Sequence, residues 1–329
     1  MYSRALVALS GGVDSSAALA MALERFSGVR AAYVDISGEG PPFHATAVAR
    51  RLGVELETVD AAGLFRDSVR EWADGMLSDG MTPNPCARCN ARVKLPVLHE
   101  RLARSEVLIT GHYARMEDGR LKRGLDGSKD QSYFLSMVDR HVIRRCIFPV
   151  GTMKKSSVRE RALKLELPFR PMESQDLCFE TSARGRPGDI VDLKGRKLGE
   201  HSGVENFTVG QRKGLGAFGE RMYVIAIDPV EGRVSVGPRD ELKASGCTVT
   251  DMNWLLDPPE AAFTAMVQTR YRRRPSRAAV SIDGDELLIR FDREEEAVAP
   301  GQVCALYQES SVIGGGLITS TYRTGWNMT

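Results

Sequence analysis

The sequence predicts an α/β chain that begins with a parallel, doubly wound sheet and continues into a small mostly-β domain and a C-terminal β-barrel. Apolar strand patterns alternate with helical patterns in the first half, whereas glycine-punctuated alternating segments fill the second half. The chain of 329 residues is longer than one hydrophobic core usually serves. We therefore expect domains at residues 1–183, 184–246 and 247–329.

Short apolar runs in the first half predict strands, and the segments between them have helical periodicity. Strands are expected at residues 5–9, 30–35, 55–59 and 106–110, and helices at 16–26, 43–52, 66–78 and 91–104. Strands that alternate with helices at this pitch indicate a parallel sheet with helices on both faces. Two prolines in residues 82–90 predict an irregular, rigid loop there.

The sequence pattern changes after about residue 184, where glycines and turn residues separate short segments of alternating apolar and polar residues. The last part of the chain predicts strands at residues 278–282, 287–291, 303–307 and 312–318. This pattern indicates a small central domain followed by a β-barrel.

Composition limits the classes of function. The formal net charge is only +2, so any nucleic-acid surface must be a local patch. We expect a cytoplasmic protein, because the sequence has neither a signal-peptide pattern nor an uncharged apolar run long enough to cross a membrane. Six cysteines in a chain of this length do not indicate a disulfide framework.

The segment between the first strand and the first helix is the sharpest chemical signal. It reads Ser10-Gly11-Gly12-Val13-Asp14-Ser15-Ser16, and its amides, together with the positive end of the following helix, can bind a pyrophosphate. Asp14 can hold Mg²⁺ or cap the helix, and the serines can donate to phosphate oxygens. The Gly-Lys-Ser/Thr of a Walker A loop is missing. The alternative is a helix cap in a generic α/β domain.

Cys86 and Cys89 form a Cys-x-x-Cys, and Cys178 follows later in the chain. A structural zinc site would need a fourth ligand, which is not evident nearby in the sequence. The thiols could instead carry a persulfide and then close a disulfide, or three thiolates could hold a [4Fe–4S] cluster with one open iron. The other three cysteines are expected to be small buried hydrophobes, namely Cys146, Cys247 and Cys304.

Many ordered motifs resemble the tRNA-specific 2-thiouridylases, whose nucleotide loop is that of the ATP pyrophosphatases. The resemblance runs over nearly the whole chain. Its motifs are the loop at residues 10–16, Thr82–Pro85 with Cys89-Asn90, Gly111-His112-Tyr113-Ala114-Arg115, residues 129–135, residues 148–151, Cys178-Phe179, residues 187–192, residues 210–216, Asn253-Trp254, Arg270-Tyr271 and Pro300-Gly301-Gln302.

The resemblance implies an ATP- and Mg²⁺-dependent enzyme that adenylates the C2 oxygen of the wobble uridine in tRNA and replaces it with sulfur from a donor. It implies ATP contacts by Ala8, Leu9, Ser10, Gly11, Gly12, Val13, Asp14, Ser15, Val34 and Gly111. It implies that Asn84, Pro85 and Cys86 face the target base, and that tRNA is bound by His112, Lys129, Asp130, Gln131, Arg270, Tyr271 and Gln302. Cys89 matches the family's nucleophile, and Cys178 matches its sulfur-carrying cysteine.

One departure concerns the thiols. Cys86 stands where the family has an aspartate, which favours a cluster held by Cys86, Cys89 and Cys178 over an acid–base role at this position. Arg88 between the thiols and Lys94 beyond them are expected to favour the thiolate.

The densest basic run is Arg270-Tyr271-Arg272-Arg273-Arg274. Arginines can pair with phosphates and a tyrosine can stack on a base, so the run predicts an RNA surface, although a solvated face is the plainer interpretation. Asp130 could equally cap the helix expected near Ser132. Two other classes remain open from the residues alone: a synthetase that adenylates a small molecule, and a non-catalytic RNA-binding protein with a structural metal.

Overall fold

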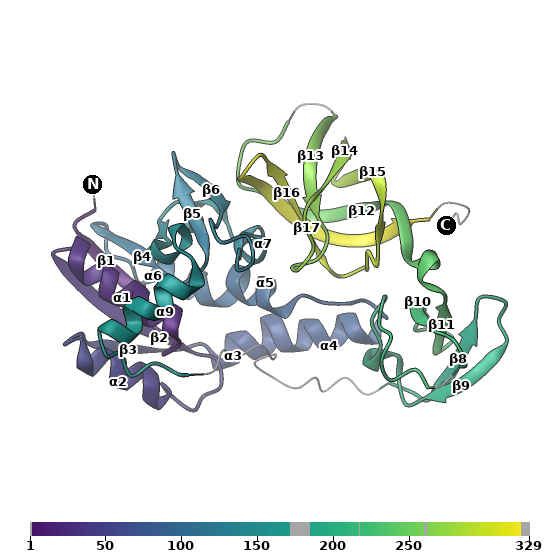
Figure 1. The fold of residues 1–329 in the computed structure, drawn as a ribbon, viewed down its shortest axis with the longest axis horizontal. Coiled ribbons are helices and arrows are strands. Elements are labelled where there is room, and N and C mark those ends of the chain that lie inside the picture. Colours follow the sequence, from purple (N-terminus) through teal and green to yellow (C-terminus); the bar gives the residue numbers. More distant parts are fainter. Residues whose placement is uncertain (1, 172–184, 217, 260–261, 324–329) are drawn as a thin grey trace.

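The described residues of the chain, 2–171, 185–216, 218–259 and 262–323 in a computed structural model, form a five-stranded, a four-stranded and an eight-stranded sheet. Figure 1 shows the parallel sheet at one end of the molecule, the barrel beside it, and the small sheet at the far end of a helical arm. This arrangement confirms the predicted fold class: a parallel α/β unit, a small mostly-β unit and a C-terminal barrel.

The parallel sheet has the strand order β3-β2-β1-β4-β7. Its central strand alternates between two cores, because Leu6 faces one apolar cluster while Ala5 and Val7 face the other. Helices on both faces complete these clusters. The strands are β1 (Arg4–Ala8), β2 (Gly28–Asp35), β3 (Leu56–Asp60), β4 (Glu106–Ile109) and β7 (Cys146–Ile147).

The helices of this unit follow the predicted periodicity. The bounds are α1 (Val13–Arg25), α2 (Phe43–Arg51), α3 (Ala62–Phe65), η1 (Arg66–Arg70), α4 (Glu71–Ser78), α5 (Pro85–Cys89), η2 (Asn90–Lys94), α6 (Leu95–Glu100), α7 (Ser132–Leu135), α8 (Arg140–Ile143), η3 (Pro149–Thr152) and α9 (Lys155–Lys164). From α3 through α4 the chain is one unbroken arm that runs from the parallel sheet toward the small sheet (Figure 1).

The prediction of an irregular loop over residues 82–90 is wrong for its second half. Helix α5 begins at Pro85, and η2 and α6 continue it to Glu100. Proline is well suited to the first helical position because its missing N–H has no helical partner there, and Asn84 caps the helix. Cys86 and Cys89 are therefore on successive turns of a helix and not in a loop.

The small sheet has the order β10-β11-β8-β9 and its own apolar cluster. It packs against the end of the arm, where α4 contacts η4 and Gly80 lies against Ile227. Its elements are β8 (Gly188–Asp192), β9 (Lys197–His201), η4 (Val204–Asn206), β10 (Tyr223–Asp228) and β11 (Arg233–Gly237), and η5 (Arg239–Leu242) leads into the barrel.

The barrel closes because its first strand, β12, pairs with both β15 and β17. Its strands are β12 (Lys243–Trp254), β13 (Phe263–Gln268), β14 (Ser276–Asp283), β15 (Glu286–Glu296), β16 (Val303–Gln308) and β17 (Ser311–Tyr322). The hairpin β5 (Ala114–Glu117) and β6 (Arg120–Arg123) of the first half joins this sheet through β17.

The barrel and the parallel α/β unit share a core. One apolar cluster contains Leu6 and Leu108 of the parallel sheet, Tyr133 of α7, and Val303 and Tyr307 of the barrel. The two units are therefore fixed to one another by apolar packing. None of the helices within the described ranges is long and apolar enough to cross a membrane.

Candidate functional site

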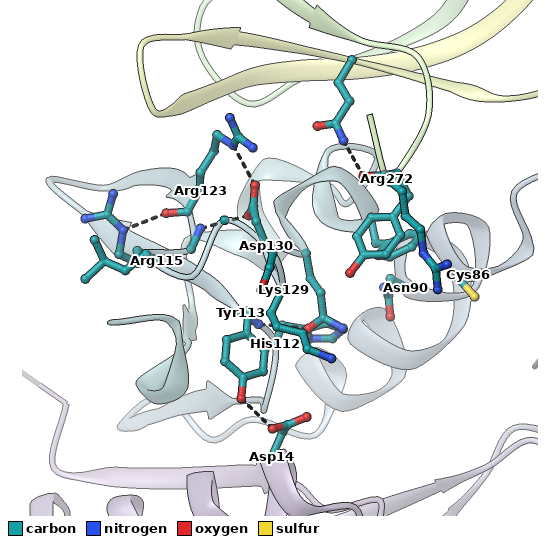
Figure 2. A pocket seen from close by; sticks show the side chains of 18 of the residues that line it. Asp14, Cys86, Asn90, His112, Tyr113, Arg115, Arg123, Lys129, Asp130 and Arg272 are labelled. Carbon is teal, nitrogen blue, oxygen red and sulfur yellow. Dashed lines mark hydrogen bonds and ion pairs between the residues drawn. The ribbon is translucent and has the colours of Figure 1, made fainter. Parts of the chain in front are cut away.

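A cavity of about 1540 Å³ lies where the parallel sheet, the helix carrying the thiols and the barrel meet. Ser10 and Asp14 of the predicted phosphate loop line it, as do the thiol-bearing Cys86 and Cys89. Barrel residues 272–275 also line it. In Figure 2, Asp14 lies at one end of the cavity, and Cys86 and Arg272 lie at another. The predicted nucleotide, thiol and basic groups thus share one space.

The phosphate loop is folded by its own hydroxyls. Ser15 and Ser16 donate to the carbonyl oxygen of Gly12 at 3.0 and 2.8 Å, and the Ser10 amide donates to Ser15 Oγ at 3.2 Å. Gly11 has φ +80°, and a Cβ there would lie 2.6 Å from the Ala45 amide nitrogen. The serine hydroxyls therefore stabilise the loop. To donate to a phosphate, as predicted, Ser15 and Ser16 would have to give up their hydrogen bonds to the Gly12 carbonyl.

The remaining predicted ATP residues surround this loop without lining the cavity. Ala8 ends β1, and the buried Leu9 donates its amide to Ala32. Val13 opens α1, and Val34 is half-buried in β2. Gly111 lies against the start of α1, where a Cβ would come within 2.7 Å of the Ser15 nitrogen. Gly111 thus allows the end of β4 to approach the phosphate loop.

Asp14 is the centre of a polar cluster. Lys155 donates to both of its carboxylate oxygens, at 2.9 and 2.7 Å, and the Tyr113 hydroxyl donates to Oδ1 at 2.8 Å. Lys155 also lies over the Tyr113 ring and lines the cavity. Neither Lys155 nor its ion pair follows from the sequence, because the two residues are far apart in the chain.

His112 lies beside this cluster and packs edge-on against Phe148. Its Nδ1 is 2.7 Å from the Thr110 hydroxyl. Burial, followed by the positive charge of Lys94, lowers the pKa of His112 to about 4. The imidazole is therefore neutral at pH 7 and can offer a nitrogen to the cavity that it lines.

The two thiols differ in exposure although both line the cavity. Cys86 is exposed, whereas Cys89 is only 5% exposed. Residues three apart lie on the same side of a helix, so one face of α5 carries both thiols. Cys178 lies outside the described residues. Before the undescribed stretch, the amide of Arg170 donates to the Gly11 carbonyl at 2.9 Å.

The basic groups near the thiols differ in position. Arg88 donates to the Ser68 carbonyl at 3.0 Å, and its guanidinium lies over the Trp72 ring. Arg88 is thus held against the helical arm and is not among the residues that line the cavity, whereas Lys94 is. Of the two expected cations, Lys94 is the one that shares the cavity with the thiols.

Several predicted tRNA contacts are engaged in bonds within the chain. Asp130 is buried, pairs with Arg123 at 2.7 Å and accepts the Ser132 amide at 3.1 Å. The N-cap position of α7 is Gln131 and not Asp130, so the alternative capping role is wrong. Gln131 Oε1 accepts the Tyr113 amide at 3.0 Å. Lys129 lines the cavity, and Figure 2 places its amine between Asp14 and Arg272.

The predicted RNA turn lies on the barrel rim. Tyr271 lines the cavity and stacks on Phe134, with ring centroids 4.2 Å apart. Burial and the nearby Arg273 lower the pKa of Arg270 from its ordinary value. The buried Gln268 holds this turn by donating to the carbonyls of Arg270 and Tyr271 at 3.0 and 2.7 Å. Sequence patterns indicated the arginines but not this support.

Comparison with known proteins finds three domain models that together match most of the chain. A tRNA methyl transferase HUP domain model matches residues 3–182, a tRNA methyl transferase PRC-barrel domain model matches 179–238, and an aminomethyltransferase β-barrel domain model matches 244–318.

Curated relatives have the same extent as this chain. The tRNA-specific 2-thiouridylase MnmA of Chloroflexus aurantiacus is 40% identical, covering 95% of this chain and 97% of its own. MnmA of Rickettsia akari is 37% identical over 98% of each chain. A solved structure, the U34-tRNA thiolase NcsA from Methanococcus maripaludis with its [4Fe–4S] cluster, covers 54% of this chain and 61% of its own at 17% identity and a TM-score of 0.35. On the identity and coverage of the MnmA relatives, the chain belongs to the tRNA-specific 2-thiouridylase family.

Proposed function

We propose that the chain is a tRNA-uridine 2-sulfurtransferase that uses ATP to replace the C2 oxygen of the wobble uridine with sulfur. The observation that carries this proposal is the single cavity lined by the phosphate loop, Cys86, Cys89 and the basic turn of the barrel. A reaction that joins AMP, a uracil base and sulfur needs these three groups in one space.

The ATP half of the site is assigned to the start of α1. Free amides and the positive helix end attract the phosphates. Asp14 is the candidate Mg²⁺ ligand because its carboxylate faces the same cavity. Lys155 neutralises Asp14 in the free protein and is placed to pair with phosphate oxygens once nucleotide binds.

The chemistry has two steps that balance. The uridine C2 oxygen attacks the α-phosphorus of ATP, pyrophosphate leaves, and the base loses its N3 proton. A sulfur nucleophile then adds to C2, the C2–O bond breaks, and AMP leaves with that oxygen. When hydrosulfide is the nucleophile, its proton returns to N3 and no oxidation occurs. AMP is needed because an unactivated carbonyl oxygen is a poor leaving group.

A persulfide on Cys178 is the second possible sulfur source. Its terminal sulfur adds to C2, and the Cys89 thiolate then attacks the Cys178 sulfur of the bridge. That attack forms a Cys89–Cys178 disulfide and leaves the other sulfur on the base. A thiol reductant must then reopen the disulfide.

A [4Fe–4S] cluster held by Cys86, Cys89 and Cys178 is the proposed cofactor. Two thiols on one face of α5, open to one cavity, fit one side of such a cluster. The described residues contain no group of three or more His, Cys, Asp or Glu that could hold a metal ion, and the third ligand lies outside them. When bound with one open iron, the cluster would hold sulfide.

The RNA half is assigned to Arg270, Tyr271 and the following arginines, with His112, Lys129 and Pro85 toward the base. Arginine side chains on the rim can pair with phosphates of the anticodon stem and loop. We also propose that the work is divided among residues 1–183, 184–246 and 247–329, and that the protein acts in the cytoplasm with a sulfur donor.

Pyrophosphate release from ATP tests the function. We expect release only when tRNA is present, and 2-thiouridine in the digested tRNA when a sulfur donor is added. Stimulation by a small acid in place of tRNA would favour the synthetase class. Tight tRNA binding without turnover would favour a non-catalytic protein.

Anaerobic purification followed by iron and sulfide analysis tests the cofactor. We expect about four irons and four sulfides per chain, and loss of both in Cys86→Ala. A colourless, iron-free protein that thiolates tRNA fully from a persulfide donor would defeat the cluster and leave the persulfide route.

A further inference from the structure

Asn90 is a buried residue that lines the cavity and directly follows Cys89 in the chain. Its side chain carries both a hydrogen-bond donor and an acceptor, although the residue is only 6% exposed. Figure 2 shows the Asn90 amide in the same space as the side chains of Cys86 and His112. Neither the ATP contacts nor the sulfur chemistry proposed above uses this amide.

Asn90 differs from the other buried carboxamides in its hydrogen bonds. Asn84 Oδ1 accepts the Ala87 amide at 3.1 Å, and Gln268 Nε2 donates to two carbonyls of the basic turn, at 3.0 and 2.7 Å. Across the described ranges, no residue forms a hydrogen bond with the Asn90 side chain. Buried polar groups are nearly always bonded, because an unpaired one is costly. The Asn90 amide is therefore available to a ligand in the cavity.

The helix presents Asn90 on the same side as the thiols. Cys86 and Asn90 are four residues apart, and so are Asn90 and Lys94, so the three share one face. A π-helical turn begins at Asn90, where the Leu95 amide donates to the Asn90 carbonyl five residues back. Pro96 follows and has no N–H for a regular helical bond. Such wide turns are rare and often occur at functional sites.

A carboxamide matches one edge of the uracil base. Uracil has an N3–H donor next to the C4 oxygen, which is an acceptor, and the amide has an acceptor next to a donor. Asn90 Oδ1 can accept the N3–H while Nδ2 donates to the C4 oxygen. This pairing leaves the C2 oxygen, which is the atom to be replaced, without a bond to Asn90.

Cytosine has the opposite pattern on this edge, with an acceptor at N3 and an amine at C4. An amide that turned over could pair with it, but Lys94 favours uracil. The Lys94 ammonium lines the same cavity one helical turn further on, and it can only donate. It therefore attracts the C4 oxygen of uracil and not the C4 amine of cytosine.

We propose that Asn90 is a specificity-determining residue, which binds the N3–H and the C4 oxygen of the target uracil and so distinguishes uridine from cytidine at the wobble position. The inference deepens the proposed function and rests on it, because it requires the base to enter this cavity. Asn90 is one helical turn from Cys86 and adjacent to Cys89 in the chain, so a base bound by its amide lies beside the thiols.

The binding test uses two tRNA transcripts that differ only in having uridine or cytidine at the wobble position, without ATP or a sulfur donor. We expect the wild type to bind the uridine transcript about tenfold more tightly. Asn90→Ala should weaken binding of the uridine transcript and bring the two Kd values within about twofold. Arg274→Ala, on the basic turn, is the control and should weaken both transcripts by the same factor, because phosphate contacts carry no base information.

Asn90→Asp keeps the shape of the side chain but exchanges its donor for a second acceptor. The carboxylate repels the C4 oxygen of uracil and accepts from the C4 amine of cytosine, so the preference should reverse toward the cytidine transcript. This variant decides the question if Asn90→Ala fails to fold. Because the Asn90 side chain bonds to none of the described residues, Asn90→Ala should retain the wild-type thermal midpoint, whereas Asn84→Ala should not.

Thiolation of the uridine transcript separates this inference from the proposed function. We expect kcat/KM to fall about 10- to 100-fold in Asn90→Ala. An Asn90→Ala protein that keeps the preference for uridine, or that matches the wild type in kcat/KM, overturns the inference alone. So does a wild type that thiolates tRNA but binds both transcripts equally. A wild type that binds them equally and forms no 2-thiouridine overturns the proposed function as well.

Discussion

His112 is a titratable residue whose surroundings change its chemistry. The folded-state pKa near 4 is below the ordinary value of about 6.5, so the unfolded chain binds more protons between these values. This residue's stabilising contribution is therefore complete above about pH 6.5 and is lost as the pH falls toward 4.

We expect His112→Asn to flatten the rise of unfolding free energy between pH 4 and 6.5, by at most about 3 kcal/mol. Urea denaturation at several pH values measures this slope. The exposed His141→Asn is the matched control and should retain the wild-type slope. Equal slopes for wild type and His112→Asn would contradict the lowered pKa of the His112 imidazole.

Lys155 is the second residue whose role depends on its neighbours. Its ammonium pairs with Asp14 at the phosphate loop, so Lys155→Met should weaken binding of Mg²⁺–ATP about 10- to 100-fold through loss of a charge-assisted contact. Titration calorimetry without tRNA measures this affinity. Lys154→Met alters the exposed neighbouring residue and should bind ATP normally. An unaltered affinity in Lys155→Met would remove Lys155 from the nucleotide site.

At the scale of the element, helix α5 was the main error of the prediction from sequence. Two prolines suggested a loop, yet Pro85 occupies the first helical position, where the missing N–H costs nothing. The capping side chain was present in the sequence as Asn84, two residues before Cys86. The start of this helix can be predicted from the sequence once Pro85 is assigned to the first helical position and not to the helix interior.

Asn84 Oδ1 accepts the Ala87 amide at 3.1 Å in a buried setting. We expect Asn84→Ala to lower the free energy of unfolding by about 1–2 kcal/mol, because the first turn then has an unsatisfied N–H. Asn84→Ser keeps an acceptor and should recover most of that loss. Urea denaturation of the three proteins measures it, and equal midpoints for alanine and serine would show that the cap contributes little.

Across the whole molecule, the barrel and the parallel sheet are joined by one apolar core. Tyr133 of α7 is buried and donates to the Val303 carbonyl of the barrel at 2.8 Å. Burial raises the pKa of Tyr133, so the phenol stays protonated and keeps this donor.

Tyr133→Phe leaves the Val303 carbonyl without this partner and should cost about 1–3 kcal/mol. Because one core spans both units, calorimetry should show a single shared transition lowered by several degrees. The exposed Tyr2→Phe should leave that transition in place. Separate transitions for the two units would contradict the shared core.

Local sequence patterns were enough to predict the loop at residues 10–16, the pair of thiols, the basic run and the strands around them, because each depends on local geometry or on a short spacing. Which side chains face the cavity could be learned only from the folded chain. Lys155 joins Asp14, Arg88 turns to Trp72, and Gln302 binds the turn at Thr82, each across a stretch of chain that periodicity does not encode. Packing of the folded chain brings together groups that are distant in the sequence. Each buried polar atom then forms a hydrogen bond with a donor or acceptor that packing has placed nearby.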